Sequence, residues 1–494
     1  MSENSPPKSF NLVTKSWLSI AGVGVVSLDE VFAPQNLQKF KRLGGTPIEK
    51  VVILRLLLCI VHASSPIPDL NAWIALTPEK LASNAREYLK IWSDRFDLYD
   101  EVHPFLQFPN RERGKVVSWW NLGVSSTDNN SVFTQSELKC VFSEAEKARL
   151  LLCGVCYSCR RKAEKLFSPY SLMGESGYLH SFLLGKNLLE TICLNLLTLK
   201  DIQELNMFKN NLGKPFWEMD FTSPKWKENY QKSYQGSLFP LDKFLYIESD
   251  GVRRDEGIPY PKSIKDGFWD PGITIFSKEK SALICSTEKL PWRSLGAILQ
   301  SAMQEKGKSS AFLKYGIMRI CKKESISHFG IWCGGAAVQI ARVKTQKIAG
   351  KYGFVDSEFQ ITTSDYDDPW WEQYQKFITQ LDEYATCVRS SVINYYKAMT
   401  DPEKNKKSKD SPFCKNMGKE AERLFWEKME HHSNAILKLA CKYDNEEEEF
   451  AQKKWQDVAF SCYEDLCPCM TPRQIQVYVE NRPRFPQTSK GKEN

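Results

Sequence analysis

The sequence has no long hydrophobic run and only a small excess of positive charge. Its most apolar stretch, VVILRLLLCIVHA at residues 51–63, is interrupted by Arg55 and is too short to cross a bilayer, so we expect a buried helix there. The N-terminus, MSENSPPKSF, has no basic start followed by an apolar segment. We therefore expect no secretory signal, no membrane partner and a cytoplasmic location. A formal net charge of +7 over 494 residues permits contact with nucleic acid but does not require it.

The common catalytic signatures are also missing. No G-x-x-x-x-G-K-[ST], G-x-S-x-G or H-E-x-x-H pattern occurs, and the chain contains only six histidines. Two of these, His431 and His432, follow Glu430 in a stretch with a helical pattern, where a solvated or partly buried pair is the simpler interpretation. We therefore predict a protein that is not an enzyme and needs no cofactor.

Cysteine, by contrast, is frequent, with 15 residues scattered mostly through apolar runs, as is typical of reduced, buried thiols. Cys153, Cys156 and Cys159 form a C-x-x-C-x-x-C run, a spacing that also occurs in zinc and iron–sulfur sites. The surrounding residues follow a helical pattern and no fourth ligand sits three residues further on, so we favour structural thiols. A metal- or redox-dependent enzyme built on these three cysteines is the alternative.

Glycine nearly disappears after residue 369, and this change predicts a domain boundary. Upstream, strand-like and helical patterns alternate, with an expected hairpin in 10–32 and expected helices at 48–63, 76–96, 136–166, 183–208 and 291–305. Downstream, amphipathic patterns run through 369–400, 416–442, 446–466 and 471–480. The predicted fold is α+β, with a large mixed α/β N-terminal domain (residues 1–365) followed by a C-terminal four-helix bundle (residues 366–494).

Positive charge is clustered beside loops of small residues. One cluster, at 160–165, precedes the loop FSPYSLMGESG, and others include Lys262 with Lys265, the stretch 342–347 and the stretch 404–409. A single cluster is typical of a solvated face. Four clusters together favour a phosphate-backbone partner.

The stretch WCGGAAVQIARVK, residues 332–344, contains a glycine pair followed by a lone glutamine and two cations. Paired glycines can cradle a phosphate, turn a hairpin, or let the backbone approach a ligand closely. No Lys-[Ser/Thr] pair directly follows the glycines, as a P-loop requires, because the first such pair is Lys344-Thr345. This spacing argues against a phosphate cradle.

Several stretches, in order along nearly the whole chain, resemble the large subunit (CasA type) of the type I-E Cascade complex, a CRISPR RNA-guided surveillance assembly of antiviral defence. The order and spacing of these stretches carry the resemblance. They are FNLVTKSWLSI, IEKVVILRLLLCIVHAS, HPFLQFPN, GVSSTDNNSVFTQ, CGVC, LLGKNLLETICLNLL, GSLFPLDKFLYIE, DGFW, GIWCGG and AERLFWEKME.

The resemblance implies a non-enzymatic subunit that recognises the protospacer-adjacent motif (PAM) in duplex DNA through the minor groove. It implies that a wedge hairpin then starts strand separation and R-loop formation, so that the crRNA can pair with its target. The implied partners are double-stranded target DNA and the crRNA-containing backbone, 5′-handle-binding and small subunits. The bundle would hold the displaced strand and position either a helicase-nuclease or a nuclease domain on another subunit.

The resemblance also implies functional positions. In loop 123–135, which matches the family's loop for docking onto the complex, we name Asn129, Asn130, Phe133 and Gln135. Loop 168–177 falls where the family carries a glycine-rich loop facing the minor groove. This sequence departs from that pattern, and the residues it offers there are Ser168, Pro169, Tyr170, Ser171, Gly174 and Gly177. Hydroxyl groups can still bond to minor-groove acceptors.

Lys262 lies near the family's minor-groove lysine. Some members carry a cysteine-rich zinc knot in this region, but residues 245–270 contain no cysteine, so we predict no metal there. GGAAVQ matches the family's wedge hairpin. We expect Gly334 and Gly335 to let that hairpin turn tightly, Gln339 to lie at its tip or flank with Gln346 as the second candidate, and Arg342 and Lys344 to hold phosphates.

Overall fold

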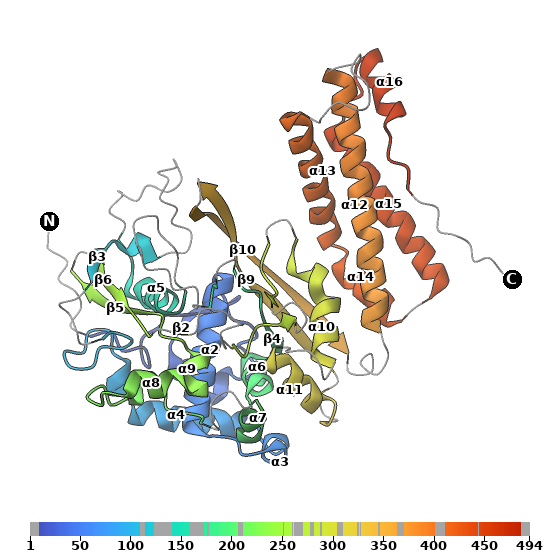
Figure 1. Ribbon diagram of the computed structural model, residues 1–494. Helices are drawn as coiled ribbons and strands as arrows, with labels where there is room; N and C mark the ends of the chain where they lie inside the picture. Colours follow the sequence, from blue (N-terminus) through green and yellow to red (C-terminus); the bar gives the residue numbers. More distant parts are fainter. Residues whose placement is uncertain are drawn as a thin grey trace. The chain divides into compact units, whose positions relative to one another are not determined.

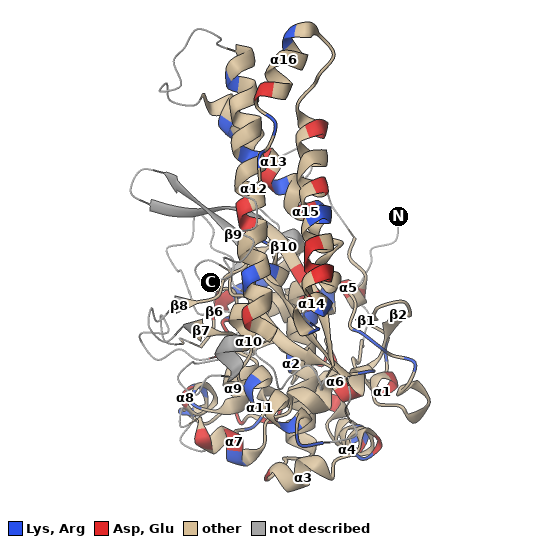
Figure 2. Cartoon of the chain, turned by 90° about the vertical axis from the view of Figure 1, so that its right-hand side faces the viewer, with Lys and Arg blue, Asp and Glu red and all other residues tan. Residues whose placement is uncertain are grey.

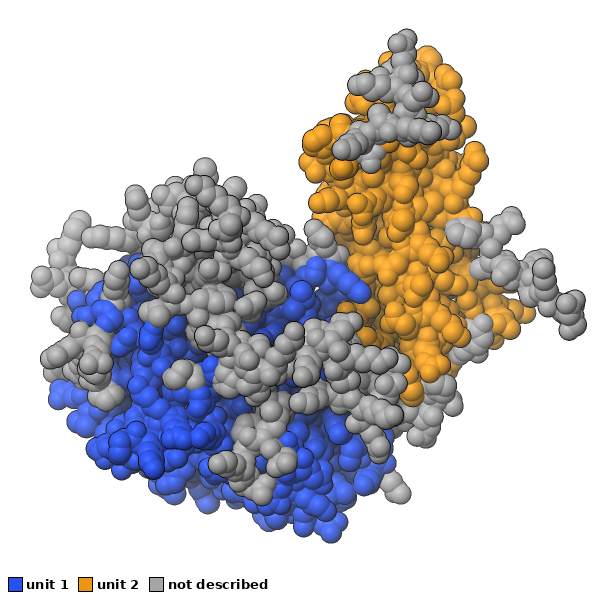
Figure 3. Space-filling view, viewed as in Figure 1, with its two compact units in different colours: residues 1–291, 300–363 blue, residues 292–299, 364–494 orange. Residues whose placement is uncertain are grey.

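The chain divides into two compact units, which Figure 3 colours separately. The first contains residues 1–291 and 300–363, and the second contains residues 292–299 and 364–494. The expected boundary near residue 365 did not anticipate the transfer of 292–299 to the second unit. The computed structural model describes residues 9–108, 114–122, 141–157, 172–174, 177–205, 211–249, 251–258, 260, 270–276, 281–286, 289–303, 310–323, 326, 328–343, 346–362, 370–400, 411–442 and 444–485.

Helix α2 (Pro47–Ser64) is the central element of the first unit (Figure 1). It begins with a capping box, in which Thr46 accepts a hydrogen bond from the backbone N–H of Glu49 and the Glu49 carboxylate bonds back to Thr46. Every residue from Val51 to His62 is buried. The elements that pack against this helix are α4 (Pro78–Ile91), α5 (Glu144–Cys156), α6 (Leu188–Asn195), β9 (His328–Val343) and β10 (Gln346–Thr362). The expected buried helix at 48–63 is confirmed. None of the described helices is long and apolar enough to span a bilayer.

A three-stranded sheet of order β10-β9-β4 packs on α2. Its strands are β4 (His180–Leu184), β9 (His328–Val343) and β10 (Gln346–Thr362). The expected helix over 183–208 is wrong: the apolar run is divided into β4, α6 and α7 (Leu199–Glu204). The physical reason is that Asn187 and Thr198 each cap a new helix start, so two short helices replace one long one.

A second three-stranded sheet, of order β3-β6-β5, consists of β3 (Lys115–Val117), β5 (Lys243–Glu248) and β6 (Gly251–Glu256). The expected N-terminal hairpin is confirmed only in part: β1 (Leu18–Ile20) pairs with β2 (Gly24–Val26), whereas residues 28–31 form a helix instead of a strand. The other elements of this unit are α1 (Leu28–Val31), α3 (Leu70–Ile74), α8 (Trp226–Gln231), α9 (Tyr234–Leu238), α11 (Ala311–Ile320), β7 (Ile275–Phe276) and β8 (Ser281–Ala282). Short 3-10 turns occupy Pro34–Asn36, Ser93–Phe96, Trp119–Leu122 and Phe216–Glu218, and a further one, Pro291–Ser294, crosses the boundary between the two units.

The second unit is helical. It contains α12 (Trp370–Thr400), α13 (Pro412–Glu430), α14 (Ser433–Cys441), α15 (Asn445–Leu466) and α16 (Pro472–Glu480), and α12 contacts each of the others. The predicted helix 416–442 forms two helices, because α13 ends at Glu430 and α14 begins at Ser433, with His431 and His432 as the caps between them. Figure 2 shows basic and acidic positions interspersed along α12, α13 and α15. Several of these residues form ion pairs, such as Arg389 with Glu422.

The segment 292–299, which includes the start of α10 (Leu295–Met303), belongs to this unit through aromatic and ionic contacts. The Arg293 guanidinium lies 3.5 Å from the ring centroid of Trp426 and pairs with Asp382. The Tyr374 hydroxyl donates a hydrogen bond to the Trp292 carbonyl at 3.0 Å. The partners Trp426, Asp382 and Tyr374 lie far along the chain, so glycine content could not assign this segment to the second unit.

Candidate nucleic-acid interface

Strands β9 and β10 form a long antiparallel hairpin whose register locates its turn. The pairs run from His328 with Thr362 to Val343 with Gln346, so residues 344–345 connect the strands. Because β4 pairs with β9 only over residues 330–334, the hairpin continues beyond that sheet as a two-stranded arm, residues 335–343 with 346–355. A narrow arm of this kind can enter a space that a globular surface cannot.

The expectation that Gly334 and Gly335 turn this hairpin is wrong, because both lie inside β9. Gly334 pairs with Asp356 on one side and with His180 on the other. A Cβ atom on Gly334 would lie 2.6 Å from the Asp356 Cβ, and one on Gly335 would lie 2.8 Å from the Tyr178 carbonyl oxygen. The glycines therefore allow close packing at the base of the arm.

The register also makes Gln346, rather than Gln339, the first candidate for the wedge tip. Gln339 lies in the ladder opposite Lys351, whereas Gln346 directly borders the connection. Arg342 lies opposite Lys347 near the same end. Lys344 and the side chains of 338–343 and 346–352 lie outside the described residues.

The base of the arm is fixed to α2 and β4 by polar and aromatic contacts. The Trp332 ring stacks on Phe182 at 4.6 Å, and its Nε1 donates to the Asp356 carboxylate at 3.0 Å. The same carboxylate pairs with the Lys50 ammonium of α2 at 2.6 Å. An arm held this way at its base can transmit force to its far end.

Of the loop 168–177, predicted to face the minor groove, the structure describes residues 172–174 and 177. The Leu172 N–H donates to the Cys156 carbonyl at 3.0 Å, so the chain returns beside its point of departure at the end of α5. Gly174 and Gly177 have φ values of +58° and +80° and shape the turn that leads into β4. Ser168, Pro169, Tyr170 and Ser171 lie outside the described residues, so their contact with DNA stays a prediction.

The segment that carries Lys262 is likewise described at its ends, Tyr260 and Asp270. The Tyr260 hydroxyl donates to the Gly236 carbonyl at 3.0 Å, and the Asp270 carboxylate accepts from Arg55 of α2. Lys262 itself lies outside the described residues, as do Asn129, Asn130, Phe133 and Gln135 of the docking loop.

Arg55, Asp270 and His180 form a fully buried cluster that sequence reasoning missed. Arg55 makes two hydrogen bonds to Asp270, at 2.8 and 2.6 Å, and approaches His180 Nδ1 at 3.3 Å. Burial, together with the nearby Arg55 charge, lowers the pKa of His180 to about 4, so its ring is neutral at neutral pH. A neutral ring can accept from Arg55 through Nδ1 and donate through Nε2 to the Leu172 carbonyl, which lies at 2.6 Å. A lone arginine in an apolar helix was the available signal, since a buried charge needs a buried partner.

The cysteine run lies partly within the described residues. Cys153 and Cys156 are buried on α5, and burial raises the pKa of the Cys156 thiol well above its ordinary value. A thiol held protonated is a poor metal ligand and a poor nucleophile. Within the described ranges, no group of three or more potential ligands could hold a metal ion, and Cys159 lies outside them.

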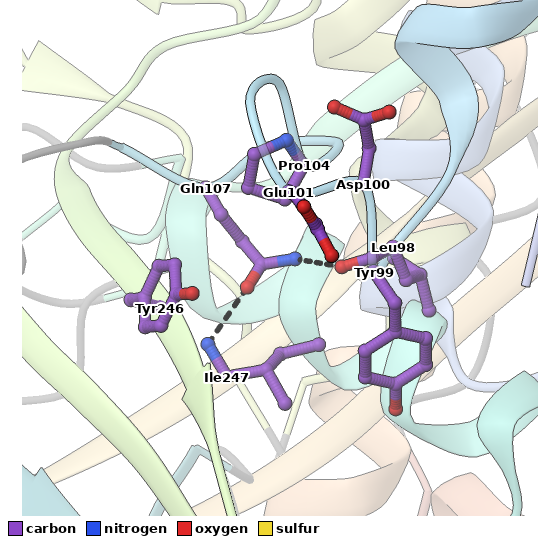
Figure 4. Close-up of a pocket in the computed structure, with 8 residues that line it drawn as sticks. All are labelled: Leu98, Tyr99, Asp100, Glu101, Pro104, Gln107, Tyr246 and Ile247. Atoms are coloured by element: carbon purple, nitrogen blue, oxygen red, sulfur yellow. Dashed lines mark hydrogen bonds between the residues drawn. The ribbon is translucent and has the colours of Figure 1, made fainter. Parts of the chain in front are cut away.

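A cleft of about 450 Å³ lies between residues 98–107 and strand β5 (Figure 4). Gln107 spans it, donating to the Leu98 carbonyl at 2.7 Å and accepting from the Ile247 N–H at 2.8 Å. The charged residues that line it, Asp100 and Glu101, are both acidic. This lining does not favour a phosphate group.

Comparison with known proteins gives consistent matches over this fold. The family model for CRISPR-associated protein Cse1 matches residues 11–465. The CasA/Cse1 protein of Thermus thermophilus is 25% identical over 343 residues, and the match covers 62% of this chain and 63% of that relative, less than two thirds of its length.

Solved structures show the same fold at low sequence identity. The CasA structure from Thermus thermophilus has a TM-score of 0.66 at 18% identity, covering 96% of this chain and 97% of that one. Thermobifida fusca Cse1 has a TM-score of 0.66 at 19% identity with the same coverage. A chain of a CRISPR RNA-guided surveillance complex has a TM-score of 0.62 at 15% identity, covering 96% of this chain and 99% of that one.

Proposed function

The chain belongs to the CRISPR-associated protein Cse1 family, and from this premise we propose that it is the PAM-recognising large subunit of a crRNA-guided type I-E Cascade complex. In this role it binds target duplex DNA through the minor groove, starts strand separation and has no catalytic activity of its own. Its partners are target DNA and the crRNA-containing backbone, 5′-handle-binding and small subunits. A solved relative of the same fold is a chain of a CRISPR RNA-guided surveillance complex, which supports this assignment.

The single observation that carries the proposal is the two-stranded arm of β9 and β10. Inserting a wedge between two stacked base pairs costs roughly a few kcal/mol per step. The inserted element must therefore be narrow and rigid. The arm ends in a two-residue connection, and Lys50, Asp356 and Trp332 brace its base. We take its far end as the wedge, with Gln346 as the first candidate for the tip and Gln339 as the second.

Around this arm, Lys262, Ser168, Tyr170 and Ser171 are the proposed minor-groove residues, and Arg342 and Lys344 are proposed to hold phosphates. Asn129, Asn130, Phe133 and Gln135 are the proposed docking residues. The helical unit is proposed to act as the family's four-helix bundle, with α13 and α14 as one broken helix. It would hold the displaced strand and position a helicase-nuclease or a nuclease on another subunit.

The proposal is tested by binding of the assembled complex to duplexes whose flanking motif is randomised. We expect strong enrichment of a few motifs, and we expect Lys262→Ala to flatten that enrichment. Lys90→Ala, which changes an exposed lysine on α4, is the matched control and should leave it intact. Uniform binding of the whole library by the unmodified complex would contradict PAM recognition.

A further inference from the structure

We propose that Arg55, Asp270 and His180 are positioning residues for reading the flanking motif. Their buried network holds described residues that flank two chain segments, 158–171 and 261–269. The inference rests on the proposed function, because these segments carry the proposed minor-groove residues.

Arg55 is the centre of the network. Besides its two bonds to Asp270, its guanidinium donates to the Leu238 carbonyl at 3.2 Å and approaches His180 Nδ1 at 3.3 Å. Asp270 also accepts a hydrogen bond from the Gly272 N–H at 2.7 Å. Arg55 and Asp270 are 2% and 1% exposed, so water cannot substitute for any of these bonds.

Tyr157 and Leu172, the described residues on either side of segment 158–171, both contact the network. His180 lies within hydrogen-bond distance of the Leu172 carbonyl, and the ring of Tyr157 lies 6.1 Å from that of His180. Because the Leu172 N–H bonds to Cys156, the two ends of the segment cannot separate without breaking a buried hydrogen bond.

The second segment, 261–269, ends at Asp270, which is itself a member of the network. Its other end is held by the Tyr260 hydroxyl, which bonds to the backbone of residues 236 and 241. The Asp242 N–H then donates to the Val155 carbonyl of α5 at 3.1 Å, one turn before the first segment begins. Arg55 therefore bonds directly to one segment end, Asp270, and through His180 to another, Leu172, while Tyr260 and Tyr157 are held by neighbouring contacts.

The buried Arg55–Asp270 pair is better explained by the fixed geometry it imposes than by any net gain in stability. Replacing a buried ion pair with apolar groups of similar volume is often neutral or stabilising, so the attraction alone gives little reason for its presence. The planar guanidinium, however, makes bonds in fixed directions, which an ammonium cannot reproduce. Side chains that read a groove must be held to within about 0.5 Å of their working geometry. The arginine fork contributes to that constraint by fixing Asp270 directly and Leu172 through His180.

The test compares Arg55→Lys with Arg319→Lys in the assembled complex. Arg319 is also buried, ion-pairs with Asp201 and bonds to the Leu196 carbonyl, so it matches Arg55 in burial and chemistry without bonding to either segment's ends. The measured quantity is the ratio of affinities for the preferred and a disfavoured flanking motif. We expect Arg55→Lys to reduce this ratio about tenfold and Arg319→Lys to leave it within about twofold, at similar shifts in thermal midpoint.

A second variant keeps the test decisive if Arg55→Lys does not assemble. Arg55→Met combined with Asp270→Leu replaces the pair by apolar groups, which should preserve folding while removing the directional bonds. We expect this double variant to assemble and to lose discrimination. An unchanged affinity ratio in either variant overturns the inference. Absence of motif preference in the unmodified complex instead overturns the proposed function, so the two failures are distinguishable.

Discussion

At the scale of single residues, two buried histidines make the fold sensitive to acid. Burial, reinforced by a nearby arginine in each case, lowers the pKa of His180 to about 4 and that of His62 to about 3. Both values lie below the ordinary 6.5, so the folded chain binds fewer protons than the unfolded chain. The stabilisation is complete above about pH 6.5 and is lost as the pH falls toward about 4, by about 1.4 kcal/mol per pH unit for each histidine.

Thermal unfolding of the isolated protein between about pH 7.5 and about pH 4.5 checks this expectation, since that window covers most of the loss due to His180. His180→Gln should make the midpoint less dependent on pH, because an amide replaces the ring without titrating. His431→Gln is the control, since His431 is exposed. A pH dependence that is identical in all three proteins would show that protonation of His180 does not limit stability.

Also at this scale, mutation can distinguish the two candidates for the wedge tip, Gln346 and Gln339. Gln346 borders the connection of the arm, whereas Gln339 is opposite Lys351 within the ladder. Loss of one amide hydrogen bond at the wedge should slow strand separation about tenfold, since such a bond contributes roughly 1 kcal/mol or slightly more. We expect Gln346→Ala to show this effect, read from a fluorescent base placed beside the motif, and Gln339→Ala to show less. The reverse order would assign the tip to Gln339.

At the scale of elements, Gly334 controls how closely β9 approaches β10. A methyl group there would meet the Asp356 Cβ at 2.6 Å and the Val355 carbonyl at 2.7 Å. We expect Gly334→Ala to lower the free energy of unfolding by about 2 kcal/mol, as overpacking does, measured by urea denaturation. Gly22→Ala is the comparison, because its Cβ would meet nothing within 4 Å and only its φ of +72° opposes the change. A larger effect at Gly22 would contradict the close-packing argument.

Elements with strong local signals were predictable, and those defined by distant partners were not. Helix α2 was predictable from its continuous apolar run, and the start of α4 from the Thr77-Pro78 pair, because these signals lie in adjacent residues. The strand β4 did not, since its five buried residues read equally well as part of a helix, and only pairing with β9 decides between the two. Likewise, GGAAVQ identified the arm, but its turn falls at 344–345, a position set by the register rather than by glycine.

The buried cluster shows the same division at the candidate site. Arg55 was visible in the sequence as an interruption of an apolar run, but its partners lie 125 and 215 residues away. No local pattern joins positions so far apart in the chain. The roles of Lys262 and of loop 123–135 come from family resemblance and stay predictions.

At the scale of the whole molecule, segment 292–299 should stabilise the helical unit specifically. We expect Arg293→Ala to remove a stacked cation from Trp426 and lower the local stability of α12 and α13 by about 1–2 kcal/mol. Hydrogen exchange of peptides from these helices should accelerate, while exchange in α2 stays unchanged. Arg423→Ala is the control, because its exposed pairs with Glu420 and Glu427 contribute well under about 1 kcal/mol. Equal acceleration by both variants would count against a special role for the segment.

The placement of 292–299 has a topological consequence. The polypeptide passes from one unit to the other three times, after residues 291, 299 and 363, so the helical unit is not a simple C-terminal appendage. A single protease cut between 363 and 370 would divide the chain into two fragments. The C-terminal fragment would still pack non-covalently against residues 292–299 of the N-terminal fragment. Nicked protein should therefore migrate as one particle under native conditions and separate into two fragments only in denaturant.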